Sequence, residues 1–380
     1  MQHPFPGVYI EKGLNERTIQ YKSYSTLFLS FTVGTQCEEA IVLHKLADIE
    51  KYSFLDESYL LTKSIKDYFN NGGKRLYLLS QPTEDEILFD KDNYIKYLSK
   101  KSDTLIDIET IVAVDLFTKE LALNVCIDIQ NSISEYCEKS SRISISDLPK
   151  EYDAIYSEAL TGSKPYFEEL KTTVSFYPWL IDKEGNSISS SVYAAALFNK
   201  VAVEENIALS IANRVLENAI DDNVKLEEEN LELFYKKGIN PIIYFRDEGY
   251  KIWGIKTLGF SDDKFEYLNT LRVFRYIKRT LYQIARQYVF EPNNYDLKHR
   301  MLRNIRTFLL PMWKNGALQG SKEEEAFMIM CDERNNSIDD ENSGYLNIDI
   351  AVSISKPLEY IVIHLNRVQN DYDHANINIS

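Results

Sequence analysis

The residue types that carry out catalysis are present in this sequence, but their spacing matches no known catalytic pattern. No histidine pair has the H-E-x-x-H spacing of a zinc enzyme, and no two cysteines have C-x-x-C spacing. The sequence also lacks a glycine-rich phosphate loop and a G-x-S-x-G nucleophile turn. The absence of these patterns favours a protein that is not an enzyme and that uses no cofactor or metal. The widely spaced histidines are His3, His44, His299, His364 and His374.

An acidic run near the C-terminal end, Glu323, Glu324 and Glu325, could bind a cation or dock a basic partner. Such a run more often opens a solvated helix, because negative charge complements the positive end of the helix dipole. Ser321 stands three residues before Glu324, which is the spacing of a capping box. We therefore expect a helix that opens at Ser321, and the three carboxylates are candidate docking charges.

Charge is spread unevenly along the chain, whose formal net charge is −15. Residues 251–314 are basic against this trend, and Arg272, Arg275 and Arg279 are candidate docking charges within them. An acidic part and a basic part allow subunits to dock head to tail, whereas solvated helix faces are the alternative. The negative net charge disfavours a general nucleic-acid-binding protein, since phosphate binding needs a positive field.

The apolar pattern alternates between strands and helices, which favours an α/β layered domain in the first part of the chain. We expect strands at residues 26–34, 75–80, 110–117, 142–147 and 172–181. We expect helices at residues 56–70 and 121–136, a long one from about 192 to 221, and another that opens at the acidic run 227–229.

In the second part of the chain, the pattern of apolar and turn residues predicts a hairpin followed by long helices and short strands. The hairpin is expected at residues 242–246 and 251–257, with glycine in its turn. Helices are expected at residues 265–288 and 297–315, and strands at 327–331, 345–353 and 361–365. No window is apolar enough to span a membrane, and the N-terminus has no secretory pattern, so we expect a soluble protein made in the cytoplasm.

Both ends of the chain are polar and carry short pieces that could form strands. An isolated pair of strands is marginally stable, so such pieces gain by adding to the sheet edge of a neighbouring molecule. The candidate contacts between subunits are Val8, Tyr9, Ile10 and Glu11 at one end and Asn376, Ile377, Asn378 and Ile379 at the other.

Several short motifs occur in one order over nearly the whole chain. They are residues 6–11 (PGVYIE), 69–73 (FNNGG), 177–180 (YPWL), 238–241 with 250–258 (GIN and YKIWGIKTL), 288–293 (YVFEPN), 316–320 with 326–332, 344–346 and 357–361. In these motifs and their order the chain resembles the phage tail sheath family. Residues 186–191 and 210–213 depart from the family pattern. The compact length is similar to that of the short sheaths of contractile injection systems and type VI-like secretion systems.

The resemblance implies an α/β (α+β) protein with layered sheets and helices in two domains. It implies an N-terminal arm at residues 1–25, an outer and middle α/β domain at 26–240, an inner C-terminal sheath domain at 241–366 and a C-terminal arm at 367–380. An α/β enzyme without a recognisable motif and a static tail or shell protein are the alternatives.

The function implied is that of a structural subunit that polymerises helically around an inner tube and contracts to drive the tube through an envelope. The implied partners are further copies of the chain, an inner tube protein, and baseplate and terminal cap proteins, and a recycling AAA+ unfoldase is left open. Neither nucleic acid nor direct membrane insertion is expected. The implied location is the cytoplasm during assembly and then a cytoplasmic or released particle.

Overall fold

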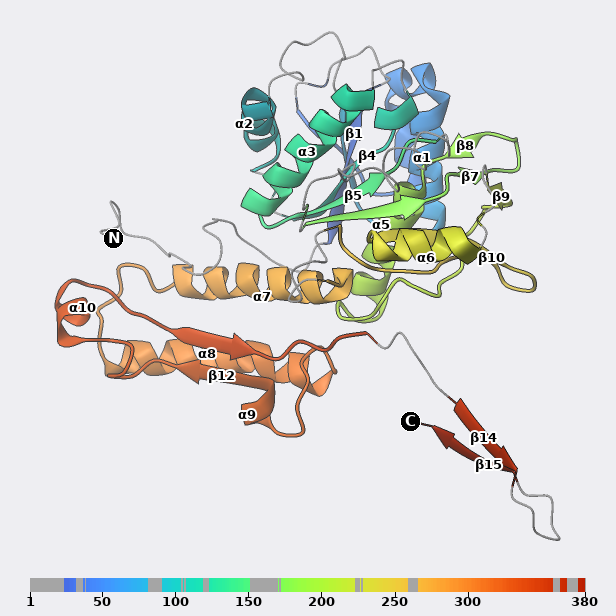
Figure 1. Cartoon of the computed structure of the whole chain (residues 1–380). Coiled ribbons are helices and arrows are strands. Elements are labelled where there is room, and N and C mark those ends of the chain that lie inside the picture. The colour runs from blue at the N-terminus through green and yellow to red at the C-terminus, as the bar shows by residue number, and fades with distance from the viewer. Residues whose placement is uncertain are drawn as a thin grey trace.

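The structure is a computed structural model of the chain in which a sheet domain stands over a pair of long helices (Figure 1). It describes residues 24–31, 37, 39–80, 91–103, 105, 107–118, 123–150, 170, 172–222, 226, 228–258, 266–357, 363–367 and 375–379. The piece expected to form a strand at Val8, Tyr9, Ile10 and Glu11 lies outside these residues.

An eight-stranded sheet organises the first domain within the described residues, in the order β11-β10-β6-β5-β4-β1-β3-β2. The strands from β3 to β10 in this order run parallel, and the short strands β2 and β11 close the two edges in the antiparallel sense. The strands are β1 (Ser25–Ser30), β2 (Ile41–Leu43), β3 (Leu76–Ser80), β4 (Ile108–Ala113), β5 (Ile143–Asp147), β6 (Thr173–Tyr177), β10 (Ile239–Phe245) and β11 (Gly249–Ile252).

The central strands are buried on both faces, as their continuous apolar runs predict. All six residues of β1 are buried. Phe28 faces a core shared with α1 (Tyr59–Asn70) and α5 (Ser190–Glu204), whereas Leu27 and Leu29 face α2 (Lys91–Ser102) and α3 (Leu123–Lys139). Alternate side chains of a strand point to opposite faces, so helices on both sides are required. The expected α/β class is confirmed.

Smaller elements fill the connections of this domain. Helix α6 (Glu228–Lys236) packs on β10 through Phe234. The others are the 3-10 helices η1 (Leu46–Lys51), η2 (Ser53–Glu57) and η4 (Leu116–Thr118), and the strands β7 (Leu180–Ile181), β8 (Ser187–Ile188) and β9 (Asp221–Asp222), which form a separate three-stranded sheet.

The long helix expected from 192 to 221 is shorter than predicted, because α5 ends at Glu204. Beyond it, Asn213 and Asn218 adopt positive φ, which asparagine tolerates and a helix excludes. This segment instead borders the outer edge of β11, where the Asn213 and Leu216 amides donate to carbonyls of that strand at 2.7 and 2.9 Å. An exposed sheet edge is thereby covered.

The second part of the chain packs two long helices against a small sheet. Helices α7 (Leu268–Arg286) and α8 (Tyr295–Lys314) share a core with β12 (Phe327–Met330) and β13 (Asp349–Val352). The short helices α9 (Glu323–Ala326) and α10 (Ile338–Asn342) lie between these elements in the chain. The domain boundary expected after residue 240 falls within β10. Both β10 and β11 belong to the large sheet.

Two further strands, β14 (Ile363–Arg367) and β15 (Ala375–Ile379), pair antiparallel with one another. Among the described strands they pair with no other, and Figure 1 draws this two-stranded ribbon apart from both larger parts. The strand expected near 361–365 is therefore present, and the polar end of the chain contains another.

Candidate subunit-contact surfaces

The three candidate arginines of α7 face the sheet domain of their own chain. Arg272 is 1% exposed and makes a two-point ion pair with Glu109 of β4, at 3.0 Å from Nε to Oε1 and 2.6 Å from Nη2 to Oε2. Arg279 approaches the same carboxylate at 3.7 Å. Arg275, buried as well, donates to the Cys137 carbonyl at 3.0 Å. The three residues therefore bind α7 to β4 and α3.

Aromatic rings complete this buried cluster. The Arg272 guanidinium lies 3.5 Å from the centre of the Phe198 ring of α5 and also donates to the Phe198 carbonyl at 2.7 Å. The Tyr24 ring, just before β1, lies 5.3 Å from the same guanidinium. Burial raises the pKa of Tyr24 and lowers the pKa of Arg279. We call Glu109, Arg272 and Arg279 the α7 ion cluster.

This placement bears on the docking role predicted for these arginines, which stays a prediction. In this conformation Arg272 and Arg275 are enclosed by their own chain and cannot reach a neighbouring subunit. The Arg279 side chain, 12% exposed, borders solvent. A substitution at Arg272 or Arg275 therefore tests the fold of the chain before it tests assembly.

The acidic run lies on the surface beside α8. Glu323 forms a two-point pair with Arg306 of α8, at 2.5 Å from Nε to Oε1 and 2.8 Å from Nη2 to Oε2. The hydrogen bond from Arg306 lowers the pKa of Glu323. Glu324 and Glu325 are exposed. The three carboxylates are thus accessible, and the docking role predicted for them stays a prediction.

The capping box predicted at Ser321 and Glu324 is wrong. Helix α9 starts at Glu323 with Lys322 before it, and it runs for one turn into β12. The Ser321 amide donates to the Glu325 carboxylate at 2.8 Å instead. Gly320 explains the tight approach, because a Cβ there would lie 2.8 Å from the Ala326 amide nitrogen.

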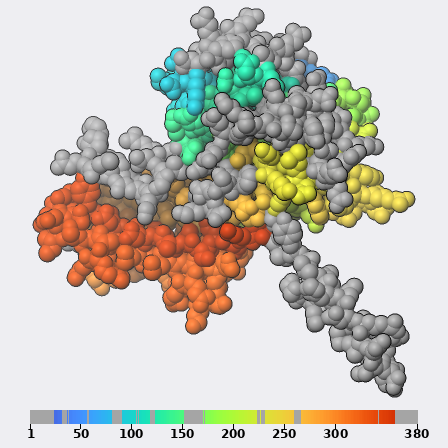
Figure 2. Space-filling view, viewed as in Figure 1, coloured from blue at the N-terminus to red at the C-terminus, as the bar shows by residue number. Residues whose placement is uncertain are grey.

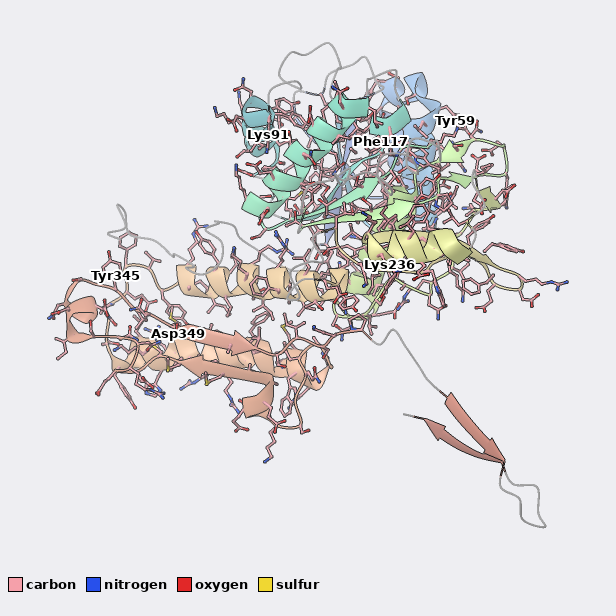
Figure 3. The ribbon with its side chains drawn as sticks, in the orientation of Figure 1. Tyr59, Lys91, Phe117, Lys236, Tyr345 and Asp349 are labelled. Carbon is pink, nitrogen blue, oxygen red and sulfur yellow. The ribbon has the colours of Figure 1, made fainter. Side chains whose placement is uncertain are left out.

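The small sheet of β12 and β13 has two strands. Phe327 and Ile329 belong to the core formed with α7 and α8, whereas Met328 on the other face is 58% exposed. Among the described residues, no further strand pairs with either of its two strands. In Figure 3, Asp349 marks where β13 begins, beneath α7. Unpaired strand edges offer backbone groups to an incoming strand.

The C-terminal candidates lie in β15. Asn376, Ile377, Asn378 and Ile379 pair with Asn366, Leu365, His364 and Ile363 of β14. The predicted strand exists, and here its partner is a strand of the same chain. Pairing with a neighbouring molecule stays a prediction. Val8, Tyr9, Ile10 and Glu11 lie outside the described residues.

Sequence reasoning missed Glu109, the anion of the α7 ion cluster. The available signal was its position, since a carboxylate within the buried strand Ile108–Ala113 requires a partner. Reasoning also missed the common face of Arg272, Arg275 and Arg279, whose spacing of three and four residues places them on one side of α7.

Metal chemistry and membrane crossing have no support in the described part of the chain. No group of three or more His, Cys, Asp or Glu side chains there could hold a metal ion. No helix there is both long and apolar enough to cross a membrane.

Comparison with known proteins finds a family match in the second part of the chain. Residues 261–366 match the phage tail sheath C-terminal domain family. The tail sheath protein of Vibrio phage KVP40 is 26% identical over 156 residues, which cover 40% of this chain and 22% of that protein. The chain thus matches about a fifth of the length of this relative. It also matches the tail sheath protein of Salmonella phage ViI, again over 22% of the length of that protein.

Solved structures extend the likeness to the whole fold. A chain of the anti-feeding prophage baseplate matches with a TM-score of 0.76 at 20% identity, over 97% of this chain and 100% of that one. A chain of the contracted sheath complex of the PVC extracellular contractile injection system matches with a TM-score of 0.74 at 22% identity, over 98% and 99%. The fold is therefore that of sheath proteins, and the resemblance inferred from the ordered motifs is confirmed.

Proposed function

We propose that this chain is a structural subunit of a contractile sheath that polymerises around an inner tube and shortens to drive the tube forward. One observation carries the proposal: the tail sheath domain at residues 261–366 stands within a chain whose fold matches injection-system proteins over nearly its full length. An enzyme and a static shell protein are not favoured, because the relatives are sheath proteins. Contraction requires no catalytic step by this chain.

Neighbouring subunits are linked through strands in this proposal. The ribbon of β14 and β15 reaches the free edges of the β12–β13 sheet of another copy, and the segment Val8 to Glu11 does the same from the other end. Each added strand satisfies backbone groups on an edge that is otherwise open. Because these links lie in terminal segments, subunits stay connected while their bodies change position.

The partners follow from this role. They are further copies of the chain, an inner tube protein, and baseplate and terminal cap proteins, and an AAA+ unfoldase that recycles the contracted form fits the same scheme. Assembly takes place in the cytoplasm, and the product is a cytoplasmic or released particle. The accessible carboxylates Glu323, Glu324 and Glu325 are the proposed tube contact. Glu323→Lys with Glu325→Lys should then alter assembly on tubes while leaving the free chain folded.

Electron microscopy of the purified chain, with and without its tube protein, tests the function. Ridged helical cylinders in a long form and a short form are expected. Persistent monomers under all assembly conditions would refute the proposal.

The strand links have a test of their own in Ile377→Pro, since proline removes a backbone donor from a strand. We expect loss of cylinders with an unchanged thermal unfolding midpoint of the body, and Ile377→Val is the matched control. Cylinders of normal length from Ile377→Pro would count against the strand links.

A further inference from the structure

Asparagine is followed directly by glycine at two places in this chain, Asn71–Gly72 and Asn315–Gly316. In such a pair the amide nitrogen of the glycine can attack the side-chain carbonyl carbon of the asparagine, because glycine has no Cβ to hinder the approach. The ring that forms expels ammonia, and water then opens it to aspartate or isoaspartate. Both pairs therefore have the local sequence that favours spontaneous deamidation.

The two pairs have the same backbone conformation. Asn71 follows α1 with φ −85° and ψ 9°, and Asn315 follows α8 with φ −90° and ψ 7°. The next residue has positive φ in both cases, +95° at Gly72 and +78° at Gly316, as is usual for glycine after a helix. The glycine amide donates to the carbonyl three residues back, at 3.0 Å in the first pair and 2.9 Å in the second. The backbone therefore restrains the attacking nitrogen in the same way at both sites.

Side-chain surroundings separate the two sites, and those of Asn71 are closed. Asn71 is 1% exposed, and its side-chain nitrogen donates to the Asp67 carbonyl at 2.9 Å and to the Glu217 carbonyl at 3.1 Å. Its side-chain oxygen accepts from the Glu217 amide at 2.8 Å. A Cβ on Gly72 would lie 2.5 Å from the Lys200 side chain, so the space beside the pair is also filled. The Asn71 side chain is thus held away from the glycine nitrogen.

The surroundings of Asn315 are open. Asn315 is exposed, and its side chain makes no hydrogen bond with any residue that the structure describes. Apart from the adjoining residues, no atom of a described residue lies within 4 Å of the position that a Cβ on Gly316 would occupy. Figure 2 shows the segment between α8 and β12 as an orange lobe on the lower side of the molecule. The Asn315 side chain is therefore free to turn toward the Gly316 nitrogen, and the ring has room to form.

We propose that Asn315 is a site of spontaneous deamidation and that the fold protects Asn71 from the same reaction. The Gly316 nitrogen bonds to Cγ of Asn315, and the proton of this nitrogen passes through water to the side-chain amide, which leaves as ammonia. Water then opens the ring. Cleavage of the new bond to Cγ gives aspartate, whereas cleavage of the original peptide bond gives isoaspartate, whose main chain runs through Cγ. Water is the only co-reactant, so the inference does not rest on the proposed function.

The reaction changes the junction between α8 and the small sheet. Both products place a negative charge beside the last carbonyls of α8, where the helix dipole is already negative. Isoaspartate also adds a methylene group to the main chain just before the segment that runs along the end of β13. In that segment the Gln319 amide donates to the Ser353 carbonyl at 2.7 Å. The Ser355 hydroxyl donates to the Gly316 carbonyl at 2.9 Å. Deamidation therefore weakens the attachment of the small sheet to α8.

Peptide mapping by mass spectrometry tests the proposal on the folded chain, kept in mildly alkaline buffer. We expect the peptide that contains Asn315 to convert from amide to carboxyl about tenfold or more faster than the peptide that contains Asn71, whose side chain must first break its hydrogen bonds. An isoaspartyl methyltransferase should label the Asn315 peptide. Equal conversion of the two peptides, or faster conversion at Asn71, would overturn the proposal.

Unfolding the chain supplies the control. In concentrated guanidinium chloride the two sites should react at the same rate, because the local sequence is the same and only the fold distinguishes them. If Asn315 stays the faster site in denaturant, the flanking sequence selects it, and the structural argument is wrong.

Asn315→Gln is the matched variant, because the longer side chain has to close a larger and less favourable ring. After prolonged incubation the unsubstituted chain should have a lower thermal unfolding midpoint than a fresh sample, and Asn315→Gln should keep its midpoint. An equal decrease in both chains would show that another change causes it and would overturn the effect assigned to the α8 junction.

Discussion

Two arginine–glutamate pairs in this chain share one geometry and differ in their surroundings. Arg272 of α7 holds Glu109 through two contacts between the sheet domain and the long helices, where both side chains are at most 4% exposed. On the surface, Arg306 of α8 holds Glu323 in the same way, through its own Nε and Nη2 atoms, and the two side chains are 58% and 26% exposed. The first pair joins two parts of the fold, and the second lies where another molecule can reach it.

The difference shows that the arginines of residues 251–314 lie in two kinds of surroundings, buried and exposed. Charged groups removed from water must be paired, so the arginines of α7 make the domain arrangement specific. Exposed pairs contribute little to stability and remain open to competition by a partner or by salt. The α7 ion cluster therefore belongs to the fold, whereas the docking role of Glu323, Glu324 and Glu325 stays a proposal.

The largest expected effect comes from Glu109→Gln. This change leaves Arg272 buried beside Arg279 without a carboxylate, and breaking a buried pair in this way costs about 3–5 kcal/mol of unfolding free energy. Chemical denaturation followed by circular dichroism measures the loss. A decrease below about 1 kcal/mol would show that the buried pair does not secure α7. Arg272→Lys, which keeps the charge and loses the two-point geometry, should lie between Glu109→Gln and the unsubstituted chain.

Another buried carboxylate, Asp147, makes no ion pair with any residue that the structure describes. Asp147, at the end of β5, accepts hydrogen bonds from the Ser191 amide at 2.9 Å, the Ser191 hydroxyl at 2.7 Å and the Ser189 hydroxyl. Burial raises the pKa of Asp147 to about 6, although these donors lower it. Because the folded pKa lies above the unfolded value, the folded state holds the proton more tightly. The contribution of Asp147 to stability is therefore full below about pH 4 and is lost as the pH rises through about 6.

Asp147→Asn removes this titration. The unfolding free energy of the unsubstituted chain, relative to this variant, should fall by about 2–3 kcal/mol between about pH 4 and pH 7. Asp332→Asn is the control of opposite sign, since the hydrogen bond from Arg334 lowers the pKa of exposed Asp332 to about 2. The stability due to Asp332 is lost as the pH falls toward that value. If the difference in unfolding free energy between the unsubstituted chain and Asp147→Asn does not vary with pH, the pKa of Asp147 is not raised in the folded state.

The smallest effect is expected for Glu323→Gln, the surface counterpart of Glu109→Gln. It removes an equally well aligned pair, yet solvent and counterions replace the lost partner of Arg306. The unfolding midpoint should stay where it is. A loss comparable to that of Glu109→Gln would remove the distinction between the two pairs.

Much of the fold could be predicted from local pattern. Continuous apolar runs located β1, β3, β4, β5 and β6, and glycine in the turn located the hairpin of β10 and β11. The helices α7 and α8 followed from their apolar spacing. The helix expected to 221 failed because the chain beyond Glu204 pairs with the edge of β11, a contact between distant segments that local spacing does not encode.

The contact surfaces could be predicted less well, for a related reason. A list of charges does not show which side chains face inward, so Arg272 and Arg306 looked alike. The burial of Arg272 depends on Glu109, which lies 163 residues away in the chain. The motif at residues 288–293 did not indicate that the Phe290 ring is exposed, because positive φ at that position is a property of the folded turn.

Cryo-electron microscopy of cylinders in the long and short forms tests whether this chain forms a contractile sheath. We expect two helical lattices of one subunit that differ in rise, with the Glu109–Arg272 pair intact in both and the contacts around α8 and α9 rearranged. A single lattice that does not shorten would contradict a contractile sheath.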